Sequence, residues 1–164
     1  MHKPAPWHRW LWISAVILVL DLATKAWITQ RFQLGETLYI LPFFNLVLAH
    51  NTGAAFSFLA GAGGWQRWFF VVVTVVVAAV LLAMLRKSPG NRLLSTALAL
   101  VLGGAAGNLW DRATMGYVVD FVQVHAAGYY FPAFNVADSA ISVGVVLLVL
   151  DSLRGEPKPQ KDAP

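Results

Sequence analysis

The sequence predicts a polytopic α-helical membrane protein, with four transmembrane helices and, on the outer side, a small β-rich element and an interfacial helix. Hydrophobic residues make up 58% of the 164-residue chain and charged residues only 12%, far from the balance of soluble globular proteins. Four apolar stretches approach the roughly 20 residues that a helix needs to cross a bilayer. The basic residues cluster between these stretches, as they do in membrane proteins with a defined orientation.

The first predicted span covers residues 10–28. Because Lys3 and Arg9 precede an apolar run, the segment begins as a cleavable signal peptide would. The run continues past Asp21, however, and no small-residue cleavage motif follows a short apolar core, so we predict a retained helix. The remaining segments are predicted spans at residues 68–85, 93–110 and 136–153 and a Pro-rich, disordered tail at residues 155–164.

The positive charges predict which ends of the spans face the cytoplasm. One side of the predicted topology carries Lys3, Arg9, Arg86, Lys87, Arg92, Arg154, Lys158 and Lys161. The other side carries Lys25, Arg31, Arg67 and Arg112. By the positive-inside rule, both termini and the loop at residues 86–92 are cytoplasmic. The basic clusters form no continuous stripe, so we expect no nucleic-acid partner.

Two longer connections then lie on the outer side, at residues 29–67 and 111–135. Residues 37–49 are rich in β-branched and aromatic side chains and are broken by Pro42, which predicts short strands at the membrane surface. The amphipathic stretch at residues 54–60 favours a helix lying in the interface.

Polar residues gather at the outer ends of the last two spans. Gly104, Asn108 and Asp111 are four and three residues apart, so they share one face of the third helix. Asn135 and Asp138 are three apart and share one face at the start of the fourth. Ionisable groups at membrane depth are costly and usually serve a site or find a partner.

A short strand predicted at residues 118–124 carries Asp120 into the same region, so three carboxyls converge from three segments. Two carboxyls brought together in a poorly solvated place cannot both ionise cheaply, so one of them holds a proton. The ionised member can activate a water molecule, and the protonated member can hydrogen-bond a carbonyl oxygen and assist the leaving amine. The pattern predicts peptide hydrolysis.

Other polar residues have structural interpretations. Asp111 is predicted to orient the site or to pair with a basic group. Asp21 and Lys25 lie four apart and are predicted to form a structural pair on the helix surface. Arg112 would by default reach toward phosphate headgroups. The GxxxG spacing at residues 103–107 is typical of helix packing.

Five sequence blocks, in order, closely resemble the signature of lipoprotein signal peptidases, also called type II signal peptidases. The blocks are DLATK at residues 21–25, NTGAAF at 51–56, GGAAGNLWDR at 103–112, GYVVDF at 116–121 and FNVADS at 134–139. Together with four spans and a length near 160 residues, the resemblance covers nearly the whole chain.

The resemblance implies an aspartic endopeptidase of the bacterial inner membrane, with its active site near the periplasmic face and no metal or organic cofactor. The implied substrates are prolipoproteins, cut just before a cysteine that carries diacylglycerol. The implied catalytic pair is Asp120 and Asp138. The implied supporting residues are Asn51, Gly104, Asn108, Asp111, Arg112 and Asn135. We also expect a monomer among membrane lipids that is inhibited by the cyclic peptide globomycin.

Two other functions remain to be compared with a peptidase of this kind. A proton-coupled transporter would need acidic residues throughout the membrane depth, but the middles of the second and third spans are apolar. A Ser–Lys protease would pair Ser139 or Ser57 with Lys25. The chain has no cysteine, and His50 and His125 lack neighbouring ligands, so neither a cysteine nucleophile nor a metal site is expected.

Overall fold

The computed structural model describes residues 6–53, 59, 63–88 and 90–154. Its helices are η1 (Trp7–Trp10), a 3-10 turn, followed by α1 (Leu11–Arg31), α2 (Trp65–Lys87), α3 (Arg92–Thr114) and α4 (Val136–Leu153). Its strands are β1 (Thr37–Leu41), β2 (Phe44–Asn51), β3 (Val118–Ala126) and β4 (Tyr129–Tyr130). All four α-helices are long and apolar enough to cross a membrane.

Helix α3 is the centre of the bundle and contacts each of the other three helices. More than half of its apolar stretch is buried, whereas α1, α2 and α4 remain largely exposed, as helices facing lipid are. Small residues allow this close packing. A Cβ at Gly103 would lie 2.8 Å from the carbonyl oxygen of Ser14 in α1, and one at Gly144 would lie 2.9 Å from that of Ala97.

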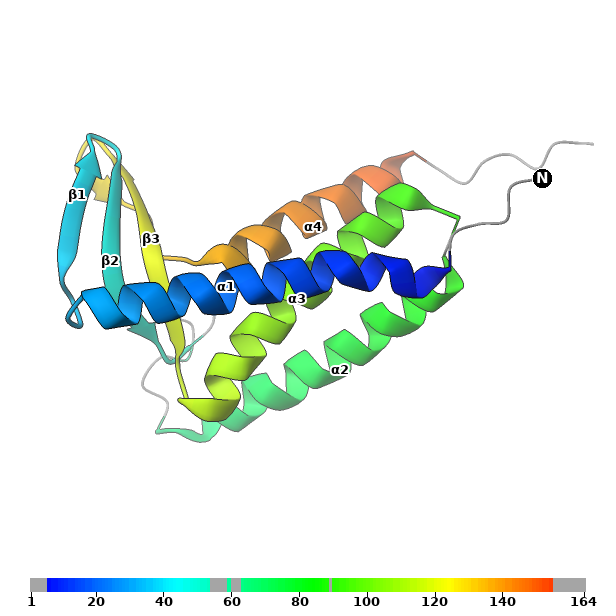
Figure 1. The fold of residues 1–164 in the computed structure, drawn as a ribbon, viewed down its shortest axis with the longest axis horizontal. Coiled ribbons are helices and arrows are strands. Elements are labelled where there is room, and N and C mark those ends of the chain that lie inside the picture. Colours follow the sequence, from blue (N-terminus) through cyan, green and yellow to red (C-terminus); the bar gives the residue numbers. More distant parts are fainter. Residues whose placement is uncertain (1–5, 54–58, 60–62, 89, 155–164) are drawn as a thin grey trace, which may run out of the picture.

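The strands form one antiparallel sheet in the order β1-β2-β3-β4. Figure 1 shows this sheet at one end of the bundle, while η1 and the end of α4 lie at the opposite end. In the pairing of β2 with β3, Ala49 is opposite Asp120 and Asn51 is opposite Val118. Side chains of paired residues point to the same face of a sheet, so the two strands present Asn51 and Asp120 to one region.

The predicted fold class of four helices with a small β-rich element is confirmed. Helices α1, α2 and α3 are longer than the spans expected from hydropathy, because polar end residues such as Arg31 and Thr114 continue the backbone hydrogen bonding, whereas α4 has the predicted bounds. The predicted strand region divides at Pro42 into β1 and β2. The interfacial helix predicted at residues 54–60 and the disordered tail predicted at residues 155–164 lie outside the described residues.

Candidate active site

A cavity of about 840 Å³ lies where the sheet meets the ends of α3 and α4. It is lined by Ala49, His50, Asn51, Thr52, Asn108, Arg112, Val118, Asp120, Phe131, Pro132, Ala133, Phe134, Asp138, Ser139, Ile141, Ser142 and Val143. Polar side chains of β2, α3, β3 and α4 therefore face one space, together with an apolar wall from α4 and the segment before it.

Asp120 lies on β3 with only 3% of its surface exposed. Its Oδ1 accepts a hydrogen bond from Asn135 Nδ2 at 2.8 Å, and its Oδ2 accepts one from Asn51 Nδ2 at 3.1 Å. Burial, and next to it the negative charge of Asp138, raise the pKa of Asp120 from 3.8 to about 7. This carboxyl therefore takes up a proton close to neutral pH.

Asp138 occupies the first turn of α4, where Asn135 is the N-cap residue. Its Oδ1 accepts a hydrogen bond from Asn108 Nδ2 at 2.7 Å, and its Oδ2 accepts one from the Asn135 backbone N–H at 3.3 Å. The Asn135 side chain in turn accepts from the Asp138 N–H at 2.8 Å, which completes a capping box. Helix capping thus fixes the position of this carboxyl.

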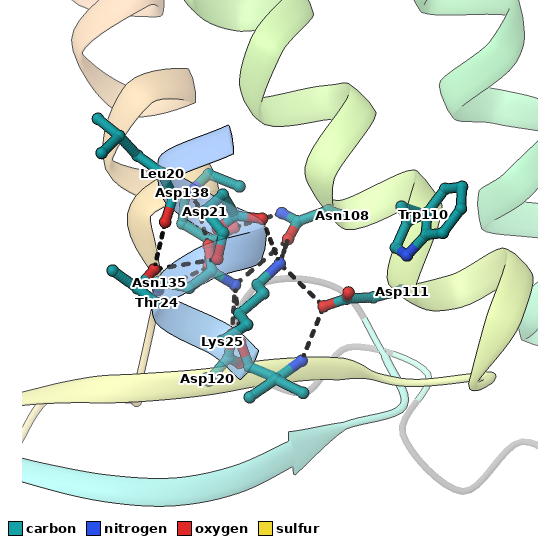
Figure 2. Close-up of polar contacts among 12 residues, drawn as sticks. Leu20, Asp21, Thr24, Lys25, Asn108, Trp110, Asp111, Asp120, Asn135 and Asp138 are labelled. Carbon is teal, nitrogen blue, oxygen red and sulfur yellow. Dashed lines mark hydrogen bonds and ion pairs between the residues drawn. The ribbon is translucent and has the colours of Figure 1, made fainter. Parts of the chain in front are cut away.

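Asn135 joins the two carboxyls (Figure 2). Its fully buried side chain donates to Asp120 and accepts from the backbone of Asp138. The same amide group also lies 3.2 Å from the carbonyl oxygen of Val119 and 3.2 Å from Asn108 Oδ1. One side chain therefore ties β3 to the start of α4 and to α3.

Beside this pair lies a group of buried charges formed by Asp21, Lys25 and Asp111. Lys25 Nζ is 2.7 Å from Asp21 Oδ2 and 2.8 Å from Asp111 Oδ2, and it donates to Asn108 Oδ1 at 3.1 Å. Asp21 and Lys25 do form a pair, but in the interior and not on the helix surface, because α1 turns this face toward α3. Asp111 Oδ2 also accepts the Val119 N–H at 3.1 Å, which fixes the strand beside Asp120.

Of the two predicted supporting residues Arg112 and Gly104, the first lines the cavity and the second does not. Arg112 Nη2 donates to the Gly53 carbonyl oxygen at 2.8 Å, and its guanidinium lies 5.1 Å from the ring centre of Phe70. Arg112 lines the cavity, where the negative charges of Asp138 and Asp120 act on it. Gly104 does not line the cavity. It lets α3 approach the backbone of Ala137 at the start of α4.

Sequence reasoning missed part of the cavity wall. Ser142 follows Asp138 by four residues, so its place on the same helix face could have been found from spacing. Phe131 and Phe134 also line the cavity, and no local sequence signal distinguishes such residues from aromatic residues that lie at the level of the lipid headgroups. His50 lines the cavity and stacks on Tyr117, with 3.8 Å between ring centres.

The contacts of Lys25 and Ser139 argue against a Ser–Lys protease. The Lys25 ammonium is surrounded by oxygens of Asp21, Asp111 and Asn108, and the Ser139 hydroxyl donates to the Asn135 carbonyl oxygen at 2.9 Å. Neither group is arranged as a base next to a nucleophile. Ser57 lies outside the described residues.

The arrangement can carry out acid–base chemistry on a bound peptide. Two carboxyls line one cavity, and one of them has a pKa near neutrality. Such a pair can hold one proton between them, as a water-activating base and an acid require. Within the part of the chain that the structure describes, no three His, Asp or Glu side chains are placed to hold a metal ion.

Comparison with known proteins gives one consistent match. A family model described as signal peptidase (SPase) II matches residues 13–154. The lipoprotein signal peptidase of Janthinobacterium sp. (strain Marseille) is 52% identical over 145 residues, covering 88% of this chain and 88% of that relative. The lipoprotein signal peptidase of Ralstonia nicotianae (strain ATCC BAA-1114 / GMI1000) is also 52% identical over 145 residues, covering 88% and 84%.

The three-dimensional comparison agrees with the sequence comparison. A solved structure described as a bacterial membrane enzyme, determined by the in meso method at 2.3 Å resolution, matches with a TM-score of 0.87. The two are 31% identical, and the match covers 100% of this chain and 99% of that one. This chain therefore belongs to the signal peptidase II family, the aspartic peptidases of family A8, and is a multi-pass membrane protein of bacteria.

Proposed function

We propose that this chain removes the signal peptide from prolipoproteins by cutting just before a cysteine that carries diacylglycerol, with Asp120 and Asp138 as the catalytic pair. The observation that carries the proposal is that these two carboxyls line one cavity and share Asn135 as a hydrogen-bonding partner. The lipoprotein signal peptidases that resemble the chain support the substrate class.

The proposed reaction begins with one proton on the pair. Because the pKa of Asp120 is raised to about 7, Asp120 holds this proton below that pH, and we assign Asp138 as the base. Asp138 takes a proton from water as the water oxygen bonds to the scissile carbonyl carbon, while Asp120 donates a hydrogen bond to the carbonyl oxygen. As the carbon–nitrogen bond breaks, the proton on Asp138 passes to the leaving amine. The products are a carboxyl terminus on the signal peptide and a free amino group on the lipidated cysteine.

The walls of the cavity suit a substrate with a peptide and a lipid part. Polar side chains of Asn51, Asn108 and Arg112 line one part, where they can hydrogen-bond a peptide backbone. Ile141, Val143 and the phenylalanines of residues 131–134 line another, where apolar chains would lose contact with water.

The proposed location follows from the positive-inside rule. Arg9, Arg86, Arg92 and Arg154 lie near the bundle end opposite the sheet, which would be the cytoplasmic side of the inner membrane. Both termini would then be cytoplasmic, and the cavity would face the periplasm. We further expect the chain to act as a monomer and to be inhibited by globomycin.

The experiment compares one prolipoprotein with and without diacylglycerol on its cysteine, each incubated with the purified chain in liposomes. We expect cleavage of the lipid-modified form alone, with cleavage blocked by globomycin. Glu36→Gln should cleave as the unsubstituted chain does, because Glu36 is an exposed carboxylate outside the cavity whose side chain accepts the Gln33 N–H. Equal cleavage of both forms would contradict the proposed substrate class.

A further inference from the structure

We propose that Lys25 is a positioning residue that determines which way the Asn108 amide faces, and thereby makes Asp138 the ionised member of the pair. This inference rests on the proposed function of Asp120 and Asp138. It concerns a residue of α1 that does not line the cavity, and whose ammonium group is buried behind Asn108 (Figure 2).

The first step is the chemistry of the ammonium group. Lysine has three N–H donors and no acceptor. Oxygens of Asp21, Asp111 and Asn108 lie 2.7, 2.8 and 3.1 Å from Lys25 Nζ, so three oxygens of the protein surround the ammonium group. Because Lys25 is buried and does not line the cavity, its effect on the reaction must pass through one of these partners.

The second step is the orientation of the Asn108 amide. An asparagine presents an acceptor oxygen on one side and a donor NH₂ group on the other. Because Lys25 can only donate, the Asn108 oxygen must face it, and the NH₂ group must then face Asp138 Oδ1 at 2.7 Å. A second donor, Asn135 Nδ2, lies 3.2 Å from the same Asn108 oxygen and supports this orientation.

The third step is the effect on protons. A carboxylate that accepts an N–H is stabilised in its charged form, whereas one facing an amide oxygen is stabilised when it holds a proton. With Lys25 present, Asp138 accepts from Asn108 and from the Asn135 backbone. Without Lys25, the Asn108 oxygen loses its charged donor and keeps the longer contact from Asn135 Nδ2, so the amide can rotate and present its oxygen to Asp138, which would draw the proton of the pair toward Asp138.

Other charged groups around the pair must be considered in any pH measurement. Arg112 of α3 interacts electrostatically with both catalytic carboxyls, and Asp111 of α3 and Asp21 of α1 flank Lys25. The β2 strand contributes His50, and burial lowers the pKa of its ring below the ordinary value.

The test uses a double substitution that leaves the net charge of the buried group unchanged. By formal charge, Asp21, Lys25 and Asp111 together sum to one negative charge, and so does the same group in the Lys25→Met/Asp21→Asn variant. Asparagine at position 21 can still accept the Ala137 N–H, so the contact between α1 and α4 is kept. A change in this variant is therefore not an effect of net charge. Thermal unfolding in detergent verifies that it is folded.

The readout is the pH dependence of kcat on a lipid-modified prolipoprotein. We expect the acid limb of the profile to shift to a pH that is about one unit higher. Losing one hydrogen bond to a charged carboxylate raises its pKa by about that amount. We expect kcat at neutral pH to fall about tenfold to a hundredfold while KM changes less, since positioning and not binding is lost. Lys87→Met, at an exposed lysine near the other end of the bundle, should match the unsubstituted chain.

If Lys25 contributes to folding alone, its replacement would lower kcat at every pH without shifting the acid limb of the profile. That result would overturn the proposal. An Asn108→Ala background gives a second test, because the limb should no longer respond to Lys25 there. If the double variant unfolds, Lys25→Met on its own is measured in the same way. Failure of the unsubstituted chain to cleave would instead count against the proposed function, so the two failures are distinguishable.

Discussion

Three asparagine side chains, Asn51, Asn108 and Asn135, donate hydrogen bonds to the two carboxyls of the proposed catalytic pair. An amide fixes the geometry of a carboxyl without adding a positive charge, so it permits the carboxyl to hold a proton. An arginine bonded directly to either group would favour two ionised carboxyls. The helix faces that carry Asn108, Asn135 and Asp138 could be predicted from their spacing in the sequence. The hydrogen-bonding partner of each amide could not be predicted, because it depends on contacts between segments that lie far apart in the chain.

The raised pKa of Asp120 predicts how stability depends on pH. Because the folded chain holds the Asp120 proton up to about pH 7 and the unfolded chain releases it near 3.8, folding binds a proton between these values. The stabilising contribution is present below about pH 4 and is lost as the pH rises through about 7. We expect the melting temperature of the unsubstituted chain, minus that of Asp120→Asn, to fall from pH 5 to pH 8 in detergent.

The matched control for this measurement is Glu36→Gln, whose difference from the unsubstituted chain should be independent of pH over the same range. A difference that stays constant for Asp120→Asn as well would show that Asp120 has an ordinary pKa. The proton of the pair would then have to reside elsewhere.

At the scale of elements, the site depends on how closely α3 approaches α1 and α4. Gly107 lies against the Asp21 side chain and Gly104 against the backbone of Ala137, so glycines of α3 bring Asn108 within reach of both neighbours. The GxxxG spacing correctly indicated close packing. Which helices would meet could not be read from the sequence, because the spans are apolar on nearly every face and hydropathy does not distinguish a lipid-facing side from a buried one.

Gly104→Ala tests this packing. The added methyl would collide with the Ala137 carbonyl oxygen, and since that neighbour is backbone, α4 must shift away from α3. We expect a loss of about 1–3 kcal/mol in stability, typical of overpacking, together with a large loss of cleavage. Thermal unfolding and the cleavage assay measure the two effects. Gly90→Ala should change neither, because among the described residues, chain neighbours apart, no atom lies within 4 Å of the new methyl.

At the scale of the whole molecule, the sheet and the buried charges are at one end of a four-helix bundle, and η1 and the end of α4 are at the other. Span number and charge bias predicted this division, because both depend on composition along the chain. The contacts of Lys25 could not be predicted, since Asn108 and Asp111 follow it by more than 80 residues. Four-residue spacing indicated its pair with Asp21 but not that the pair would be buried.

The absence of cysteine in the chain permits a direct test of orientation. Tyr129→Cys places a thiol on the sheet at a position that is 83% exposed, and Lys87→Cys places one at the opposite end of the bundle. A membrane-impermeant maleimide should label Tyr129→Cys in cells with a permeabilised outer membrane, and Lys87→Cys only after lysis. The reverse pattern would place the cavity on the cytoplasmic side.

The measurement that tests the catalytic pair most directly is the turnover of a lipid-modified prolipoprotein by Asp120→Asn and Asp138→Asn, each made alone and each verified as folded. Because one carboxyl must act as base and the other as acid, we expect each substitution to lower kcat by at least about a thousandfold, while Glu36→Gln remains fully active. Robust turnover by either aspartate variant would contradict the assignment of Asp120 and Asp138 as the catalytic pair.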